Sequence, residues 1–111
     1  MIILIEKHHI IFKSQGGLDF ELNYKYLSSE DHRGNLGPHL NRKVDLHYKR
    51  ELELKLRKLL RDEYYTIEEL IDILGLKKKQ AYKAFRIIKK TEYGMRTEDV
   101  IFRLLGGSFY L

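Results

Sequence analysis

The chain has 111 residues, 43% of them hydrophobic, which is enough for one domain or two very small units with an apolar core. The absence of cysteine excludes disulfides, thiol catalysis and zinc sites of the cysteine type. The formal net charge of +5, from 21 Lys and Arg against 16 Asp and Glu, favours a polyanionic partner.

The first 39 residues predict two antiparallel strands joined by a long loop. Apolar residues mark the strands at 2–12 and 22–27, and the turn-forming pair Gly16-Gly17 lies between them. The opening apolar residues are followed by charged residues too soon for a signal peptide, and no apolar run in the chain is long enough to span a membrane. We therefore expect a soluble, cytoplasmic protein with no membrane partner.

A short helical turn and then a long helix over 40–61 are predicted next. Ser28 or Ser29 can cap the turn. The turn is limited by Gly34, Gly37 and Pro38. One apolar face of this helix is predicted from the spacing of four leucines, Leu52, Leu56, Leu59 and Leu60. We interpret most of this helix as a structural brace, and His47, which lies among charged residues, as a solvated or packing residue.

Residues 62–111 predict a second, helical unit. Thr66 caps a helix over 67–74, which ends at Gly75. A second helix is expected at about 78–90, and Thr97 caps a third that ends at Gly106-Gly107. The expected fold class is therefore α+β, with one unit at 1–61 and another at 62–111.

Four histidines and one asparagine gather around the strand pair. His8 and His9 close the first strand, Asn23 opens the second, and His32 lies on the short helical turn, with His39 shortly after it. Neighbouring residues of a strand point to opposite faces, so His8 and His9 are free to take different roles. A strand pair packed on a helix can bring the His8-His9 pair, Asn23 and His32 to one cleft.

The stretch "KHHIIFKSQGGLDFELNYKYLSSEDHRG" resembles the HNH nucleases, whose fold is a two-stranded ββα unit around one metal ion. The shared pattern is a His-His pair, a Gly-Gly loop, Asn23, and His32 nine positions later. The continuation "GNLGPHLNRKVDLHYKRELELKL" is similar to HNH proteins of bacteriophages, and the resemblance covers roughly residues 5–58.

The resemblance implies a role for each of these residues. His9 matches the general base that takes a proton from the attacking water, and His8 matches a metal-ligand position where many members carry Asp. Asn23 matches the residue that holds the loop or lies near the metal. His32 matches the final metal ligand, and His39 resembles either a third ligand or a phosphate contact of the phage members.

The metal and its support differ from the common pattern of the family. Imidazole ligands suit zinc, nickel or manganese, whereas magnesium prefers oxygen, so Mg, Mn, Zn and Ni all stay open as the single divalent ion. Many members also carry paired cysteines for a structural zinc, which this chain lacks. We therefore expect no second metal, and we expect the long helix to support the site instead.

The stretch "TIEELIDILGLKKKQAYKAFRIIKK" is similar to a helix-turn-helix. It has seven basic residues and no acidic residue from Lys77 to Lys90. The residues expected to face DNA are Lys77, Lys78, Lys79, Gln80, Lys83 and Arg86, with Gln80 or Arg86 nearest the base edges. The alternative is a solvated basic helix in an ordinary three-helix bundle.

These observations lead to a metal-dependent DNA endonuclease that hydrolyses phosphodiester bonds. From the resemblance we expect a phage-encoded protein, acting in the cytoplasm of a bacterial host with DNA and with the phage terminase or other packaging proteins as partners. The alternative is a non-catalytic helix-turn-helix regulator, or a phage packaging accessory protein, on an HNH-like scaffold. A homing-type enzyme with a specific target is a third hypothesis.

Overall fold

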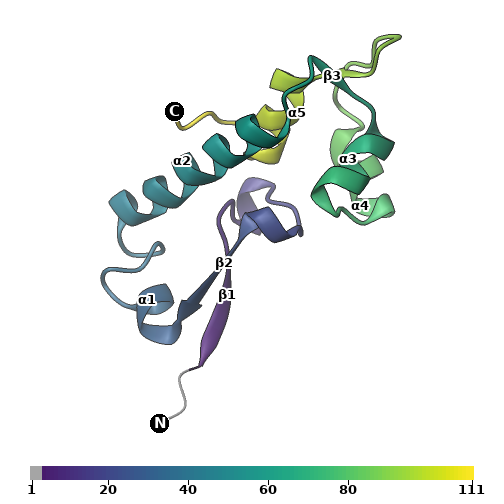
Figure 1. The fold of residues 1–111 in the computed structure, drawn as a ribbon. Helices are drawn as coiled ribbons and strands as arrows, with labels where there is room; N and C mark the ends of the chain where they lie inside the picture. The colour runs from purple at the N-terminus through teal and green to yellow at the C-terminus, as the bar shows by residue number, and fades with distance from the viewer. Residues whose placement is uncertain (1–3) are drawn as a thin grey trace.

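The computed structural model describes residues 4–111, so residues 2 and 3 of the first predicted strand lie outside the described residues. Within that range the fold is α+β, as expected, with two small antiparallel sheets and five α-helices. Figure 1 shows the first strand pair at one end of the molecule, with the long helix α2 (Arg42–Leu59) running from that end towards the C-terminal helices. None of the described helices has the length and apolarity to cross a membrane.

The first sheet pairs β1 (Ile5–His9) with β2 (Tyr24–Ser28) in antiparallel register, with His9 opposite Tyr24. Both strands are shorter than predicted. After His9 the chain turns inward, and Ile10 and Ile11 become core residues. The amide of Asn23 donates to the Phe20 carbonyl at 2.9 Å, so Asn23 lies in a 3₁₀ turn (Glu21–Asn23) just before β2 and does not open the strand.

The loop between the strands packs tightly against itself. A 3₁₀ turn at Lys13–Gln15 ends at Gly16, whose φ of 86° favours glycine. A Cβ at Gly17 would lie 1.8 Å from the carbonyl oxygen of Ile11, so the loop needs glycine at that position too. In Figure 1 this loop lies between α2 and the C-terminal helices.

Two helices follow the first sheet. Helix α1 (Ser29–Arg33) begins after Ser28, whose hydroxyl accepts from the amide of Asp31 at 3.1 Å. Asn41 caps α2 through its side-chain oxygen, so the long helix begins and ends slightly inside the predicted 40–61 range. The predicted apolar face is present, but Leu59 is 44% exposed and Leu60 takes the buried place.

The predicted helix starting at Thr66 is confirmed as α3 (Ile67–Leu74). Thr66 and Glu69 form the expected capping box, and Gly75 ends the helix in the left-handed conformation. Helix α4 (Lys78–Phe85) is five residues shorter than predicted. It stops because the carbonyl of Phe85 accepts from the amide of Ile88, which closes a turn in place of another helical turn.

The last helix, α5 (Thr97–Leu104), begins differently from the prediction. Arg96 is its N-terminal boundary residue, and the Thr97 hydroxyl donates to the carbonyl of Asp62 at 2.5 Å instead of capping the helix. A second sheet, which was not predicted, pairs β3 (Tyr64–Tyr65) with β4 (Met95–Arg96). Its two-residue strands are too short to produce a recognisable alternation of apolar residues.

Both halves of the chain contribute to one hydrophobic core. Ile11 and Phe20 from the loop region, with Leu56 of α2, belong to the same buried cluster as Phe85 and Leu104 of the C-terminal helices. The predicted boundary between residues 61 and 62 therefore divides the chain but not the core. This shared packing fixes the loop between β1 and β2 against the C-terminal half.

Candidate metal centre and catalytic site

Three of the four predicted histidines form one cluster. His8 comes from the end of β1, His32 from α1, and His39 from the turn after α1. One ring nitrogen of each lies within 4.8 Å of the others, and the Nε2 atoms of His32 and His39 are 2.8 Å apart. These side chains are close enough to hold one metal ion.

Glu6 orients His32 towards this cluster. The Nδ1 atom of His32 lies 3.0 Å from the Glu6 carboxylate, which leaves Nε2 free to face the other two histidines. Hydrogen bonds from His32 and Arg33 hold the pKa of Glu6 below its ordinary value, so the carboxylate stays charged. A carboxylate behind a histidine is a common way of fixing a metal-ligating imidazole.

The electrostatics of the cluster suit a cation. His8 is 2% exposed, and burial, with the nearby His39 and His32, lowers its pKa to about 4. Burial and His32 also lower the pKa of His39. Both rings are therefore neutral at neutral pH, with lone pairs available to a metal.

The buried Nε2 atom of His8 also fits a metal ligand. Among the described residues it has no hydrogen-bond partner. An unpaired buried polar atom destabilises the fold, and a bond to a metal ion would remove that cost. All three imidazoles therefore fit a divalent cation by position, His8 and His39 fit it also by protonation state, and His8 by its unmet bonding.

The long helix supports the cluster, as expected. The buried Lys49 of α2 pairs with Asp45 at 2.8 Å and lies 4.4 Å from the ring centre of Phe12. Phe12 in turn packs edge-on against His8, at 5.6 Å between ring centres, and beside His39 at 5.1 Å. A side chain from the helix thus backs two of the three candidate ligands through one aromatic ring.

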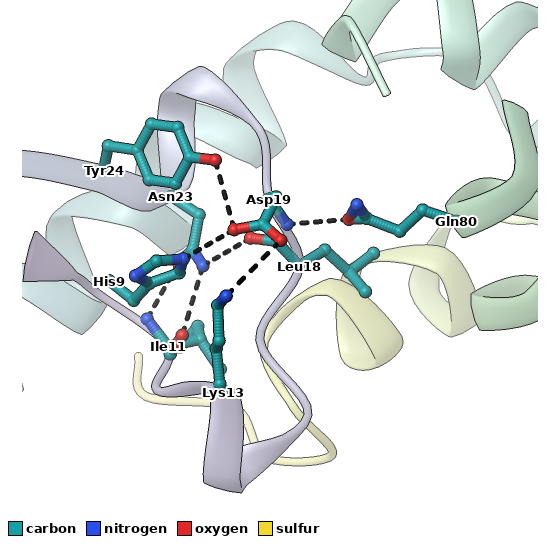
Figure 2. Close-up of polar contacts among 8 residues, drawn as sticks. All are labelled: His9, Ile11, Lys13, Leu18, Asp19, Asn23, Tyr24 and Gln80. Atoms are coloured by element: carbon teal, nitrogen blue, oxygen red, sulfur yellow. Dashed lines mark hydrogen bonds and ion pairs between the residues drawn. The ribbon is translucent and has the colours of Figure 1, made fainter. Parts of the chain in front are cut away.

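His9 has a different partner from its neighbour. Its Nε2 lies 2.7 Å from Oδ1 of Asp19, and the Tyr24 hydroxyl donates to the same oxygen at 3.2 Å (Figure 2). The hydrogen bond from His9 and the charge of Lys13 keep the pKa of Asp19 below its ordinary value. Asp19 was not among the predicted site residues, because an acidic residue in an irregular loop carries no spacing signal.

Asn23 is fully buried and holds the loop. Its Oδ1 accepts from the Ile11 amide at 2.8 Å, and its Nδ2 donates to the carbonyls of Ile11 and Leu18 at 3.1 and 2.8 Å (Figure 2). Both polar atoms of the amide are thus occupied by backbone. Of the two roles that the resemblance implies for Asn23, these contacts fit the loop-holding one, so we treat it as a positioning residue.

One pocket joins the histidine cluster to His9. It has a volume of about 230 Å³, and its lining comprises Lys7, His8, His9, Phe12, Lys13, His32 and His39. Two lysines therefore stand beside the imidazoles. This combination of neutral imidazoles and cations fits an anionic ligand such as a phosphate group.

The basic residues predicted to face DNA lie on or next to α4. Lys77, Lys78, Lys79, Lys83 and Arg86 are exposed. Gln80 is half-buried, and its Oε1 accepts from the backbone amide of Asp19 at 2.7 Å. This bond, and not a base edge, occupies the Gln80 oxygen. His47 is exposed on α2 and does not line the pocket of the other histidines, in agreement with its expected solvated role.

Comparisons with protein-family models, with curated proteins and with solved structures give no match for this chain. Its function must therefore be argued from the geometry of its own residues.

Proposed function

We propose that this protein is a metal-dependent endonuclease that hydrolyses phosphodiester bonds of DNA. One observation carries the proposal: three imidazoles converge within 4.8 Å in the same pocket as His9, which is paired with a carboxylate at 2.7 Å. A cation site beside a histidine–carboxylate pair can supply both the Lewis acid and the general base for phosphodiester hydrolysis.

The metal would be held by His8, His32 and His39. A divalent cation bound there would act as a Lewis acid on a phosphate oxygen and stabilise the negative charge that develops during hydrolysis. An all-imidazole ligand set favours zinc, nickel or manganese over magnesium. In this proposal His39 takes the role of a third ligand, because its ring packs on both other histidines.

His9 would act as the general base. With Nε2 donating to the charged Asp19, the neutral ring keeps a lone pair on Nδ1, which can take a proton from the attacking water. The Asp19 carboxylate would then stabilise the imidazolium, as the acidic residue does in a catalytic triad. Lys7 and Lys13, beside the imidazoles, would attract the phosphate.

A plasmid assay tests this proposal. Supercoiled plasmid is incubated with the purified protein and Mn²⁺, Mg²⁺, Ni²⁺ or Zn²⁺ in turn, and nicked and linear products are separated on a gel. We expect product with at least one of these ions, loss of product in His9→Ala and His8→Ala, and no change in His47→Ala, which removes an exposed histidine outside the pocket. Absence of product with every ion would reject the nuclease.

The exposed basic side chains around α4 favour a second candidate, a DNA-binding protein without catalysis. Such a protein would serve as a regulator or as an accessory to a phage terminase during packaging, and the three-histidine cluster would hold a structural metal. This second candidate predicts that the protein binds DNA through Lys83 and Arg86 and that it cleaves no DNA with any ion. The plasmid assay therefore separates the two candidates.

A further inference from the structure

A run of basic side chains leads away from the histidine pocket. Lys13 lines that pocket and also a neighbouring hollow of about 420 Å³. Lys83 and Arg86 line this second hollow too. Lys83 and Arg86 also line a third hollow, of about 580 Å³. The three hollows therefore adjoin through shared residues. Seven cations line them, of which Arg103 is half-buried and bonded to backbone carbonyls. We call the other six the basic track: Lys7, Lys13, Lys79, Lys83, Arg86 and Lys90.

The positive charge of the basic track is largely uncompensated. Among the described residues, Asp19 is the only carboxylate that lines these three hollows. Within residues 4–111 only Lys13 of the track forms an ion pair, at 3.9 Å to Asp19, and that carboxylate is already bonded to His9. Exposed cations gathered without counter-charges repel one another, and a polyanion laid along them relieves that repulsion.

Hydrogen bonds fix the two parts of the basic track relative to each other. The loop with Lys13 is tied to α4 through the Gln80–Asp19 bond of 2.7 Å. From the other side, the Arg103 guanidinium donates to the carbonyls of Gly16 at 2.8 Å and Ala84 at 3.0 Å. The cations of the loop and of α4 thus form a preorganised surface, which lowers the entropic cost of binding an extended ligand.

We propose that the basic track binds the backbone phosphates of duplex DNA and leads one of them into the histidine pocket. The choice of DNA as the polyanion rests on the proposed function. Single-strand binding surfaces combine cations with rows of exposed aromatic rings. Among the described residues, the three hollows have two aromatic residues in their lining: Phe12, whose ring packs against His8 and His39, and Tyr82, whose hydroxyl donates to Glu68. They do not form a row.

The contacts of Gln80 define what kind of recognition is expected. The Gln80 oxygen is bonded to the Asp19 amide, so it is not free to read a base edge. The remaining groups of the track are lysine and arginine cations, which neutralise phosphates of any sequence. Binding along the track is therefore independent of base sequence and strongly dependent on salt.

The test measures binding without catalysis. The 111-residue chain carrying His9→Ala is titrated in EDTA into a fluorescein-labelled duplex of roughly 20 bp, and the dissociation constant is followed by anisotropy at several salt concentrations. Six phosphate contacts predict a slope of log K against log salt of about −5. Adding Lys83→Ala and Arg86→Ala should weaken binding by about tenfold or more and make the slope shallower by about 2.

A matched control removes the same charge elsewhere. Lys58 and Arg61 are exposed, and neither lines the three hollows. The Lys58→Ala, Arg61→Ala variant should bind duplex DNA as tightly as the His9→Ala protein that carries it. If both double variants lost the same affinity, only net charge would matter and the proposed role of the basic track would be wrong. Failure to bind duplex, or tighter binding of a single strand or of duplex RNA of the same length, would also overturn it. Because metal and His9 are absent from this assay, a failed nuclease proposal leaves its result unaffected.

Discussion

The imidazole of His9 and the carboxylate of Asp19 are joined by a bond of 2.7 Å between Nε2 and Oδ1. The two residues are ten positions apart, one at the end of β1 and the other in the loop that returns to β2. His8, the immediate neighbour of His9, turns instead into the three-histidine cluster. Adjacent strand residues thus face two parts of one pocket, His9 towards the Asp19 carboxylate and His8 towards the other two histidines.

Substitution of Asp19 should impair catalysis without impairing the metal site. In Asp19→Asn the amide keeps the shape of the carboxylate but lacks its charge, and its NH₂ group can donate to His9 and favour the wrong tautomer. We expect the cleavage rate to fall by roughly 10²-fold. Metal affinity measured by calorimetry should stay unchanged, and Asp31→Asn, an exposed acid on α1, is the control. Wild-type cleavage by Asp19→Asn would remove Asp19 from the mechanism.

Loss of the Asn23 amide should destabilise the whole protein. Asn23→Ala leaves the amide and carbonyl of Ile11 and the carbonyl of Leu18 without their side-chain partner in the interior. The free energy of unfolding in urea should fall by about 2–4 kcal/mol. Asn35→Ala, at an exposed turn position, should change it little. If Asn23→Ala were as stable as the wild type, the loop would not depend on this amide.

The sequence predicted the strongly patterned elements best. The capping box of Thr66 and Glu69 and the terminal Gly75 signalled α3 from local residues alone, and the spacing of apolar residues signalled α2. The C-terminal end of α4 and the cap of α5 were mispredicted, because a turn at Phe85 ends the first and Thr97 bonds to the distant Asp62 carbonyl instead of capping the second. The Thr97 contact is tertiary and leaves no trace in nearby residues, and no glycine or proline marks the turn at Phe85.

The same distinction applies to the candidate site. The approach of His32 to the strand histidines was predicted from the strand pair and the short helix, whereas His39 was suggested by the resemblance alone, as a third ligand or a phosphate contact. The structure shows His8, His32 and His39 lying together. Glu6, Asp19 and the Gln80 bond to the loop were not predicted. Their roles depend on the pairing of β1 with β2 and on how α4 packs against the loop, which only the three-dimensional arrangement reveals.

The low pKa of His8 makes stability depend on pH. An unfolded histidine titrates near 6.5, whereas burial and the neighbouring His39 and His32 lower the pKa of His8 to about 4 in the fold. The unfolded chain therefore binds the proton first, and metal-free stability should fall by up to about 3 kcal/mol as the pH drops from 6.5 to 4.

Urea unfolding in EDTA at pH 7 and pH 4.5 measures this dependence on pH. His8→Leu should remove most of it and leave the contribution of His39, whose pKa is also lowered, and His47→Ala should leave it unchanged. Glu6, Asp19, Glu51 and Glu68 are the carboxylates with a lowered pKa among the described residues, and they lose their contribution only as the pH falls through and below their ordinary values, so they act mainly below this window. An unchanged slope in His8→Leu would show that His8 is not the group responsible.

Glu6 should control metal affinity through His32. The carboxylate accepts from Nδ1 of His32 and so leaves Nε2, which faces His39, free for the metal. In Glu6→Gln the amide can turn its NH₂ group towards Nδ1, and the charge that strengthens His32 as a ligand is lost. We expect zinc affinity to fall about 10–100-fold, with zinc still bound, whereas His32→Ala should abolish the site.

Calorimetric titration of zinc measures both effects, and the rise in melting temperature on adding excess zinc gives an independent readout. Glu30→Gln, on the exposed side of α1, supplies the control for charge. Equal zinc affinity in Glu6→Gln and wild type would mean that His32 is oriented by its packing against His8 and His39 alone, whose ring centres lie 5.0 and 4.7 Å away.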